Sequence, residues 1–462
     1  MFKKVLNLLF PTKLKRSISS DYLINDPSTP SLVEKTKHPS VGNLKFQVKD
    51  LDFSPKNTDQ KRALNSYITI GNFLNYIQEN AKSPIKRWAS TDVLNVNCLA
   101  GKDLNAFYDR HSLRFYYERK GLKTIFMADS TDIVSHELGH AILDAMRPDF
   151  WSVQSHEIWA FHEAFSDICS IVNIMQHEIV LKMAIEETNN NLFKSNIISR
   201  LAEEVGIFVY ENYSKTNGYL TNALRDAATE IYTYKSSDKL PEDAPNNQLS
   251  SECHSYGRVF LSVWYHILCK IYIKQLESNP PIVALKNARD ISFFMLLQAI
   301  PISPRVVEFH SALATCMVNI AKMKYPEYTD IVKNSFIEWN ILKNNTIKML
   351  SNTTRHEVIL NLNKNDQVLK NSKGAIIRLS RQKTLKIENL SILSNNKLNN
   401  VEVEIPADLY FSFNEKGVLI DEIIPDDQDI LNSTISCLSY VEKTQNDMWK
   451  VKNNKLLRNF II

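Results

Sequence analysis

Glycine is scarce in this chain, and long hydrophobic runs and a large excess of charge are missing. Only 10 of its 462 residues are glycine, whereas the average share is about 7%. We therefore do not expect a glycine-rich phosphate-binding loop, and no dinucleotide-binding or P-loop motif occurs. No apolar run reaches the ~18 residues that a membrane-spanning helix needs. The 55 basic and 51 acidic residues give a net charge of only +4 without a dense basic block, so a nucleic-acid partner is not expected.

Cysteine is also sparse, and its six copies stand alone along the chain without a Cys-x-x-Cys pair. This pattern predicts reduced, mostly buried thiols. It makes the cytoplasm the default location, with export by a route that uses no cleaved signal as the alternative. The six residues are Cys98, Cys169, Cys253, Cys269, Cys316 and Cys437.

The first 45 residues are rich in Ser, Pro, Lys and Asn and show little periodicity. We expect residues 1–45 to form a basic, mostly disordered tail or linker. The apolar patch between Val5 and Phe10 is too short for a signal peptide, and no small-residue cleavage site follows it. Contact of this basic segment with a membrane surface, or an export address, is the alternative interpretation.

The rest of the chain mixes helical and strand-like patterns and predicts an α+β protein. An N-terminal α/β lobe is expected at 46–150, with a helix near 60–82. A mainly helical lobe is expected at 151–345, and a β-rich accessory domain at 355–462. Further helices are expected at 131–146, 156–185, 194–213, 257–276, 285–300, 305–323 and 327–343. In the accessory domain, short strands are expected at 357–362, 375–380, 401–405 and 409–413.

The strongest motif is Ser-His-Glu-Leu-Gly-His at residues 135–140. On a helix, His136 and His140 lie one turn apart, and their imidazoles leave the same face. Zn²⁺ binds such nitrogens at about 2.0–2.1 Å, needs a third protein ligand and keeps one position open for water in catalytic sites. Glu137 follows the first histidine, where its carboxylate can reach that water without binding the metal. The motif therefore predicts a zinc hydrolase.

A third ligand is expected on a helix that packs beside the first, and the segment 156–175 offers several. Glu163 and Asp167 are four residues apart and share one helix face. One of these carboxylates can bind zinc while the other accepts the N–H of a ligating imidazole. Glu157 and His162 lie on the same segment, and the residues alone leave the choice open.

These motifs resemble a known family. His-Glu-Leu-Gly-His at 136–140, followed by Glu-Ala-Phe-Ser-Asp at 163–167, is similar to the HExxH…ExxxD signature of the thermolysin-like zinc metallopeptidases, the gluzincins. Asn-Ala-Phe-Tyr at 105–108 resembles the family's edge strand, which pairs with the substrate backbone. Leu-Arg at 224–225 resembles its carbonyl-binding arginine, and His-Ser-Tyr-Gly at 254–257 resembles its second catalytic histidine.

The resemblance covers roughly residues 60–343 and implies a two-lobed metallopeptidase fold. It also implies a role for each matching residue. Zinc is bound by His136, His140 and Glu163, with Glu137 as the general base and Asp167 orienting the first histidine.

The remaining matches imply contacts with the substrate. The oxyanion is stabilised by His254 and Arg225. The peptide backbone of the substrate is held by Asn105 and Ala106. The pocket for an apolar side chain after the cut is lined by Ile133 and Leu224.

The chain departs from the family's pattern at several positions. His162 stands where the family has an amide residue, and the family's oxyanion-binding tyrosine has no counterpart between the second zinc histidine and the glutamate ligand. The aspartate partner of the second catalytic histidine is also missing, and Glu252 is a candidate substitute. Asp132 matches one calcium-ligand position, so Ca²⁺ is a second candidate ion beside one Zn²⁺ per chain.

The leading hypothesis is a zinc-dependent endopeptidase that acts on a peptide or protein substrate and prefers an apolar residue after the cut. A second hypothesis is a narrow-specificity protease effector or toxin, with residues 355–462 or the basic tail selecting its target. A third is a catalytically weakened, metal-binding pseudoenzyme, although the retained Glu137 argues against it. An aminopeptidase is disfavoured, because the sequence shows no acidic motif that could bind the free amino terminus of a substrate.

Overall fold

The computed structural model describes most of the chain between residues 19 and 461. The apolar patch between Val5 and Phe10, the expected strand at 357–362 and Cys437 all lie outside the described residues. Helices and several small sheets share the described part, which confirms the predicted α+β class. The described residues are 19–27, 32–39, 42–80, 85–153, 155–213, 218–343, 367–387, 390–393, 396–398, 401–414, 419–423, 449–452, 455–458 and 460–461.

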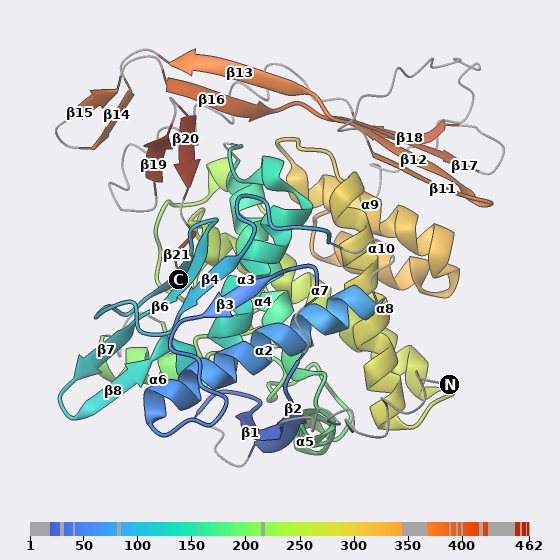
Figure 1. Cartoon of the computed structure of the whole chain (residues 1–462). Helices are drawn as coiled ribbons and strands as arrows, with labels where there is room; N and C mark the ends of the chain where they lie inside the picture. Colours follow the sequence, from blue (N-terminus) through green and yellow to red (C-terminus); the bar gives the residue numbers. More distant parts are fainter. Residues whose placement is uncertain are drawn as a thin grey trace, which may run out of the picture.

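A five-stranded mixed sheet lies at the left of the molecule in Figure 1. Three of its strands, β3, β4 and β6, run parallel to one another, whereas β5 is antiparallel to β6, and β21 is antiparallel to β5. The outer strand beside β5 therefore comes from the last described residues of the chain. In spatial order the strands are β21 (Phe460–Ile461), β5 (Ala106–Tyr108), β6 (Ser112–Phe115), β4 (Leu94–Asn97) and β3 (Phe46–Val48).

Long helices pack in series next to this sheet. Helix α3 contacts both α2 and β5, and it packs along α4; α4 then packs on α7, and α7 on α8. This order places α3 between the sheet and the helical lobe. The helices are α2 (Thr58–Asn80), α3 (Thr131–Met146), α4 (His156–Ile174), α5 (Glu178–Thr188), α6 (Glu203–Asn212), α7 (Cys253–Leu276), α8 (Pro281–Ile302), α9 (Phe309–Lys324) and α10 (Thr329–Glu338).

Most of the expected helices occur, but two differ from the prediction. The helix expected at 156–185 is broken after α4, and the chain bends by 100° before α5 begins. The helix expected at 194–213 is reduced to α6, because β9 (Arg200–Leu201) pairs with β10 (Arg225–Asp226) instead of continuing the helix. This short pairing fixes the backbone of Arg225, which the sequence pattern does not indicate.

The first described residues form a hairpin and not a tail. Strand β1 (Ser19–Leu23) pairs antiparallel with β2 (Val33–Lys37), and the last N–H of β1 donates to Asn65 Oδ1 of α2 at 2.8 Å. Tyr22 in this hairpin is only 1% exposed. The predicted disordered tail at 1–45 is therefore wrong for this segment. The hairpin is held by contacts with α2, which is distant in the sequence. The local sequence pattern therefore does not reveal it. A second hairpin is formed by β7 (Tyr117–Lys120) and β8 (Lys123–Phe126).

Strands of the last hundred residues form two four-stranded sheets and a short hairpin, drawn above the helices in Figure 1. Their order is β11-β12-β17-β18 in one sheet and β13-β16-β20-β19 in the other, and the hairpin is β14-β15. The strands are β11 (Gln367–Asn371), β12 (Gly374–Leu379), β13 (Gln382–Ile387), β14 (Leu390–Leu393), β15 (Asn396–Leu398), β16 (Val401–Pro406), β17 (Leu409–Asn414), β18 (Leu419–Ile423), β19 (Trp449–Lys452) and β20 (Lys455–Arg458).

A buried group of charges fastens the β11-β12-β17-β18 sheet to the helices. Asp408, which is 0% exposed, accepts hydrogen bonds from Arg305 Nη2 at 2.9 Å and from Arg378 Nη1 at 3.2 Å. Asp149 Oδ2 lies 2.8 Å from Arg147 Nη2 and 3.1 Å from Arg305 Nε. Burial alone raises the pKa of Asp149, but the surrounding arginines outweigh it and hold that pKa well below its usual value. Because an uncompensated buried charge is costly, this network fixes the sheet on the helices.

Within the described residues, no single helix is both long and apolar enough to cross a membrane. Helices α4 and α5 reach the required composition only as a pair, across the 100° bend.

Candidate metal centre

Helix α3 carries the two histidines of the motif toward α4. Ser130 caps its first turn by accepting a hydrogen bond from the Ile133 N–H at 3.3 Å. The helix is buried over nearly its whole length, because the sheet covers one side and α4 the other. The four-residue spacing brings the rings of His136 and His140 together, with centroids 4.9 Å apart.

Two glycines allow the three helices of the site to approach closely. A Cβ atom on Gly139 of α3 would lie 2.7 Å from the Ser166 Cα atom of α4. A Cβ atom on Gly257 of α7 would lie 2.8 Å from the Ala160 carbonyl oxygen of α4. Both distances are too short for non-bonded atoms, so any larger residue would push the helices apart. Helices α3, α4 and α7 therefore meet at the site because glycine stands at each crossing.

Three ligand atoms converge between these helices. Glu163 Oε2 lies 3.4 Å from His136 Nε2 and 3.8 Å from His140 Nε2. Donor atoms that bind one tetrahedral zinc ion at about 2.0–2.1 Å lie about 3.3–3.4 Å from one another. Two imidazole nitrogens and one carboxylate oxygen are also the donors that zinc prefers. The donor types therefore fit a zinc ion, and the Glu163 oxygen lies at the required spacing from His136 and about 0.4 Å beyond it from His140.

The carboxylate of Asp167 orients the first histidine. Its Oδ1 atom lies 2.8 Å from His136 Nδ1, which leaves Nε2 directed at Glu163. Burial lowers the pKa of His136, but the Asp167 and Glu163 carboxylates outweigh it and raise the pKa to about 9. The carboxylates around this ring favour positive charge at the site, and a metal that binds the imidazole must displace a proton.

Arg225 shares the same carboxylate. Its Nη1 atom donates to both oxygens of Asp167, at 2.7 and 3.0 Å. Burial raises the pKa of Asp167, but Arg225 and the hydrogen bond to His136 reverse this effect and lower it. Arg225 therefore keeps Asp167 ionised, a positioning role that sequence reasoning did not assign to it.

Glu137 lies in a setting that suits a general base. The side chain is 0% exposed, and burial raises its pKa to about 8, although the charge of His136 and the Tyr108 backbone N–H act in the opposite direction. Atoms of His136, Glu137 and His140 come within 4.8 Å of one another. Burial thus favours the protonated carboxyl here, and a cation bound by the neighbouring histidines would favour the carboxylate that a general base needs.

His254 approaches the centre from the first turn of α7. Its Nε2 atom lies 3.4 Å from Glu163 Oε2, and its Nδ1 atom lies 2.7 Å from Glu252 Oε1. Burial lowers the pKa of His254, but Cys253, Glu163 and Glu252 raise it well above its usual value. The charged imidazole can therefore donate a hydrogen bond to an oxyanion. Glu252 is the residue that the sequence offered as a partner for His254, and it does contact the ring.

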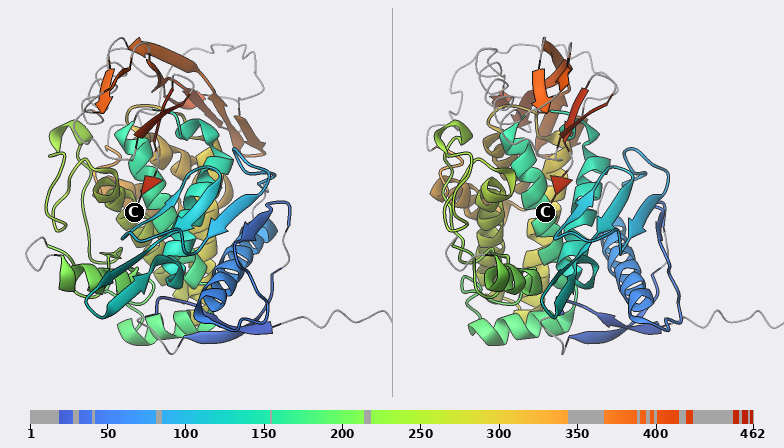
Figure 2. Two further views of the ribbon diagram at one scale, coloured as in Figure 1. Left: turned by 60° about the vertical axis from the view of Figure 1, so that its left-hand side comes forward. Right: turned by 90° about the vertical axis from the view of Figure 1, so that its left-hand side faces the viewer.

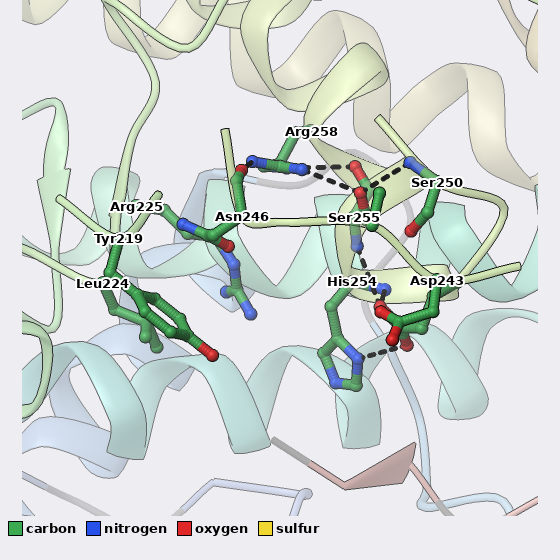
Figure 3. Close-up of a pocket in the computed structure, with 11 residues that line it drawn as sticks. Tyr219, Leu224, Arg225, Asp243, Asn246, Ser250, His254, Ser255 and Arg258 are labelled. Carbon is green, nitrogen blue, oxygen red and sulfur yellow. Dashed lines mark hydrogen bonds and ion pairs between the residues drawn. The ribbon is translucent and has the colours of Figure 1, made fainter. Parts of the chain in front are cut away.

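A cavity of about 200 Å³ opens beside His254. Figure 3 shows the His254 imidazole on one side of it, Tyr219 and Leu224 on the other, and the Arg225 guanidinium between them. Of the two residues expected to line a pocket, Leu224 lines this cavity, whereas Ile133 does not and is buried in α3. Arg225, expected at the oxyanion, also lines it.

The predicted substrate-binding strand lies against α3. Ala106 is buried at the start of β5, and Asn105 immediately precedes the strand. The Tyr108 hydroxyl donates to Asp144 Oδ2 of α3 at 2.9 Å, which ties β5 to the helix of the two histidines. The far edge of β5 is paired with β21. This pairing was not predicted.

The structure separates the candidates for the third ligand. Glu157 points away from the centre: its Oε1 atom accepts from the Tyr234 hydroxyl at 2.6 Å, and its Oε2 atom accepts from the first turn of α9 at 2.7 Å. The ring of His162 stacks on that of His140, with centroids 5.8 Å apart. Among these candidates, Glu163 and Asp167 are the two that place a carboxylate oxygen near an imidazole nitrogen of α3.

Two further residues lie near the centre. Cys253, which sequence reasoning treated only as a buried thiol, forms a group with Glu163 and His254 whose ligand atoms lie within 4.8 Å of one another. Like the other cysteines in the described ranges, it is buried and is not part of a disulfide. Asp132 accepts a hydrogen bond from the Ala202 N–H at 3.0 Å, and burial raises its pKa well above its usual value.

Comparisons with known proteins do not extend these observations. The chain matches no protein-family model, and no curated protein is significantly similar to it.

Proposed function

We propose that this chain is a zinc-dependent endopeptidase with a thermolysin-like arrangement of its site. The observation that carries the proposal is the convergence of His136, His140 and Glu163, with ligand atoms 3.4 and 3.8 Å apart, beside a buried glutamate. A zinc ion bound by these residues supplies a water molecule whose pKa is lowered toward about 7. Ca²⁺, with Asp132 as a ligand, stays a secondary proposal.

The remaining residues supply the proton transfer and the charge stabilisation. Glu137 accepts the proton of the attacking water and delivers it to the leaving amine. His254, held protonated by Glu252, donates a hydrogen bond to the developing oxyanion. Arg225 lies at the same cavity, where its guanidinium adds positive charge while it holds Asp167.

The substrate is proposed to bind as an extended strand along β5, with Asn105 and Ala106 contacting its backbone. The side chain after the cut then enters the cavity beside Leu224. The apolar lining there is limited to a few residues, and the acidic Asp243 stands at the same cavity.

The direct test is hydrolysis of an unfolded protein such as casein by the zinc-loaded chain. Glu137→Gln should lower the rate by about 10³-fold or more, because removal of the base leaves the water unassisted, while zinc content stays the same. The matched control is Glu186→Gln on the exposed face of α5, which should cleave like the wild type. Equal rates for Glu137→Gln and the wild type would reject the assignment of the base.

A second candidate function, a protease with a narrow range of targets, is favoured by one specific observation. The edge of β5 that should receive the substrate is already paired with β21. A generic peptide must displace this strand, whereas a dedicated partner can do so with additional contacts. Such a protein cleaves casein slowly and one partner quickly, and a proteome-wide cleavage profile distinguishes the two cases.

A further inference from the structure

The unexpected neighbour of β5 is the chain's own strand β21. Phe460 stands opposite Tyr108, and Ile461 opposite Phe107, in antiparallel register. The other side of β5 pairs with β6 over the same two residues. At Phe107 and Tyr108, therefore, both edges of β5 are occupied, and Figure 2 shows the red arrow of β21 beside the sheet in two views.

This pairing occurs next to the catalytic residues. The backbone N–H of Tyr108 lies close enough to Glu137 to act on its carboxylate. The Tyr108 hydroxyl is bonded to Asp144 of α3, two turns after Glu137. Strand β21 thus takes the place along β5 that an extended peptide needs in order to reach the centre.

The strand is delivered by the last sheets and is not a loose end. Only Asn459 separates β21 from β20, and β20 pairs with both β16 and β19. The neighbouring sheet is anchored to the helices through Asp408. Because the link between β20 and β21 is so short, β21 stays near β5 at a local concentration in the millimolar range.

We infer that the outer edge of β5 is a binding site for an extended peptide segment, and that β21 is its resident ligand. It occupies the edge at Phe107 and Tyr108 and so blocks a substrate strand that runs along the same edge from Asn105 and Ala106. This inference rests on the proposed function for its effect on catalysis, but not for the binding itself. The last sheets then have a definite role: they hold a strand that closes the substrate edge until a substrate or partner displaces it.

The first test removes the strand. A variant that ends at Arg458 should show a kcat/KM for a peptide substrate about tenfold or more above the full chain, mainly through a lower KM, because the tethered competitor is gone. A synthetic peptide of residues 455–462 should inhibit the shortened variant competitively, and a scrambled peptide should not. An unchanged KM together with no inhibition would overturn the inference.

The second test measures binding without catalysis. In a Glu137→Gln background, the labelled 455–462 peptide should bind the shortened variant, as followed by fluorescence anisotropy, and should bind the full chain at least about tenfold more weakly. Binding without any hydrolysis in the active background rejects the proposed function and keeps the site. Hydrolysis without binding rejects the site and keeps the function.

A third variant guards against misfolding of the shortened chain. Phe107→Cys with Ile461→Cys places two thiols opposite each other across β5 and β21. Oxidation should lock the strand and abolish peptide binding, and reduction of the same sample should restore it. Equal peptide binding in the oxidised and reduced forms, with the disulfide confirmed by mass spectrometry, would contradict the inference.

Discussion

Glu252 both caps helix α7 and holds the imidazole of His254. Its Oε2 atom accepts the N–H groups of His254 and Ser255 at 2.9 and 3.0 Å, and its Oε1 atom lies 2.7 Å from His254 Nδ1. One carboxylate therefore starts the helix and fixes the ring that points at the metal centre.

Substitution of this glutamate should separate its two roles. Glu252→Gln keeps an oxygen for the helix cap but removes the charge that keeps His254 protonated. We expect kcat to fall about ten- to hundredfold with little change in KM. Because the pKa of His254 falls, the alkaline limb of the kcat profile should move to lower pH. A variant with an unshifted pH profile would show that Glu252 serves only the helix.

Asp167 should control zinc affinity through His136. Asp167→Asn removes the charged acceptor of the Nδ1–H group and leaves Arg225 without its partner. We expect zinc affinity to fall about 10–100-fold, as is usual when such outer partners are lost. Competition with a chromogenic chelator measures it. The exposed Asp330 of α10 provides the matched control, because Asp330→Asn should bind zinc like the wild type.

Glu157 should make stability fall as the pH rises. Burial raises its pKa to about 8 from the usual 4.5, so near neutral pH the folded chain holds a proton that the unfolded chain has lost. The stabilisation is complete below about 4.5 and is lost as the pH rises through about 8, with a slope of at most about 1.4 kcal/mol per pH unit.

Glu157→Gln removes this titration while keeping an acceptor for α9. Relative to the wild type, its melting temperature should improve steadily between pH 5 and pH 8.5. Burial also lowers the pKa of nearby His310, to about 3, but that histidine is present in both proteins and cancels in the comparison. A difference in melting temperature that does not change with pH would show that Glu157 is ionised in the folded chain.

Asp408 should be important for stability and not for chemistry. Asp408→Asn leaves Arg305 and Arg378 buried with reduced compensation, so the free energy of unfolding should fall by about 3–5 kcal/mol. A lower urea midpoint reports this loss. Glu422→Gln on the exposed face of β18 serves as the control and should leave the midpoint within about 0.5 kcal/mol of the wild type. An equal midpoint for both variants would mean that the network is dispensable.

The local part of the site was predictable from the sequence, because a helix fixes residues four positions apart on one face. His136 with His140, and Glu163 with Asp167, follow from that rule alone. The distance between the two helices does not follow from it. It depends on Gly139 at their crossing, and a single glycine inside a helical pattern has no obvious meaning before the packing is known.

The long-range pairings could not be predicted for a related reason. Strand β21 has only two residues, and its partner Tyr108 lies in a distant lobe, so no local pattern connects them. The hairpin that contains Tyr22 was missed in the same way, since it is stabilised by contacts with α2. The role of Arg225 toward Asp167 depends on the pairing of β9 with β10, which replaces an expected helix.

The most direct test of the central claim is the zinc content of the purified chain. After loading with zinc and dialysis against metal-free buffer, mass spectrometry of the metal should find about one zinc per chain. His140→Ala, which removes one of the three ligands, should retain almost none under the same conditions. A wild-type protein without zinc, or a His140→Ala variant that retains as much as the wild type, would contradict the account.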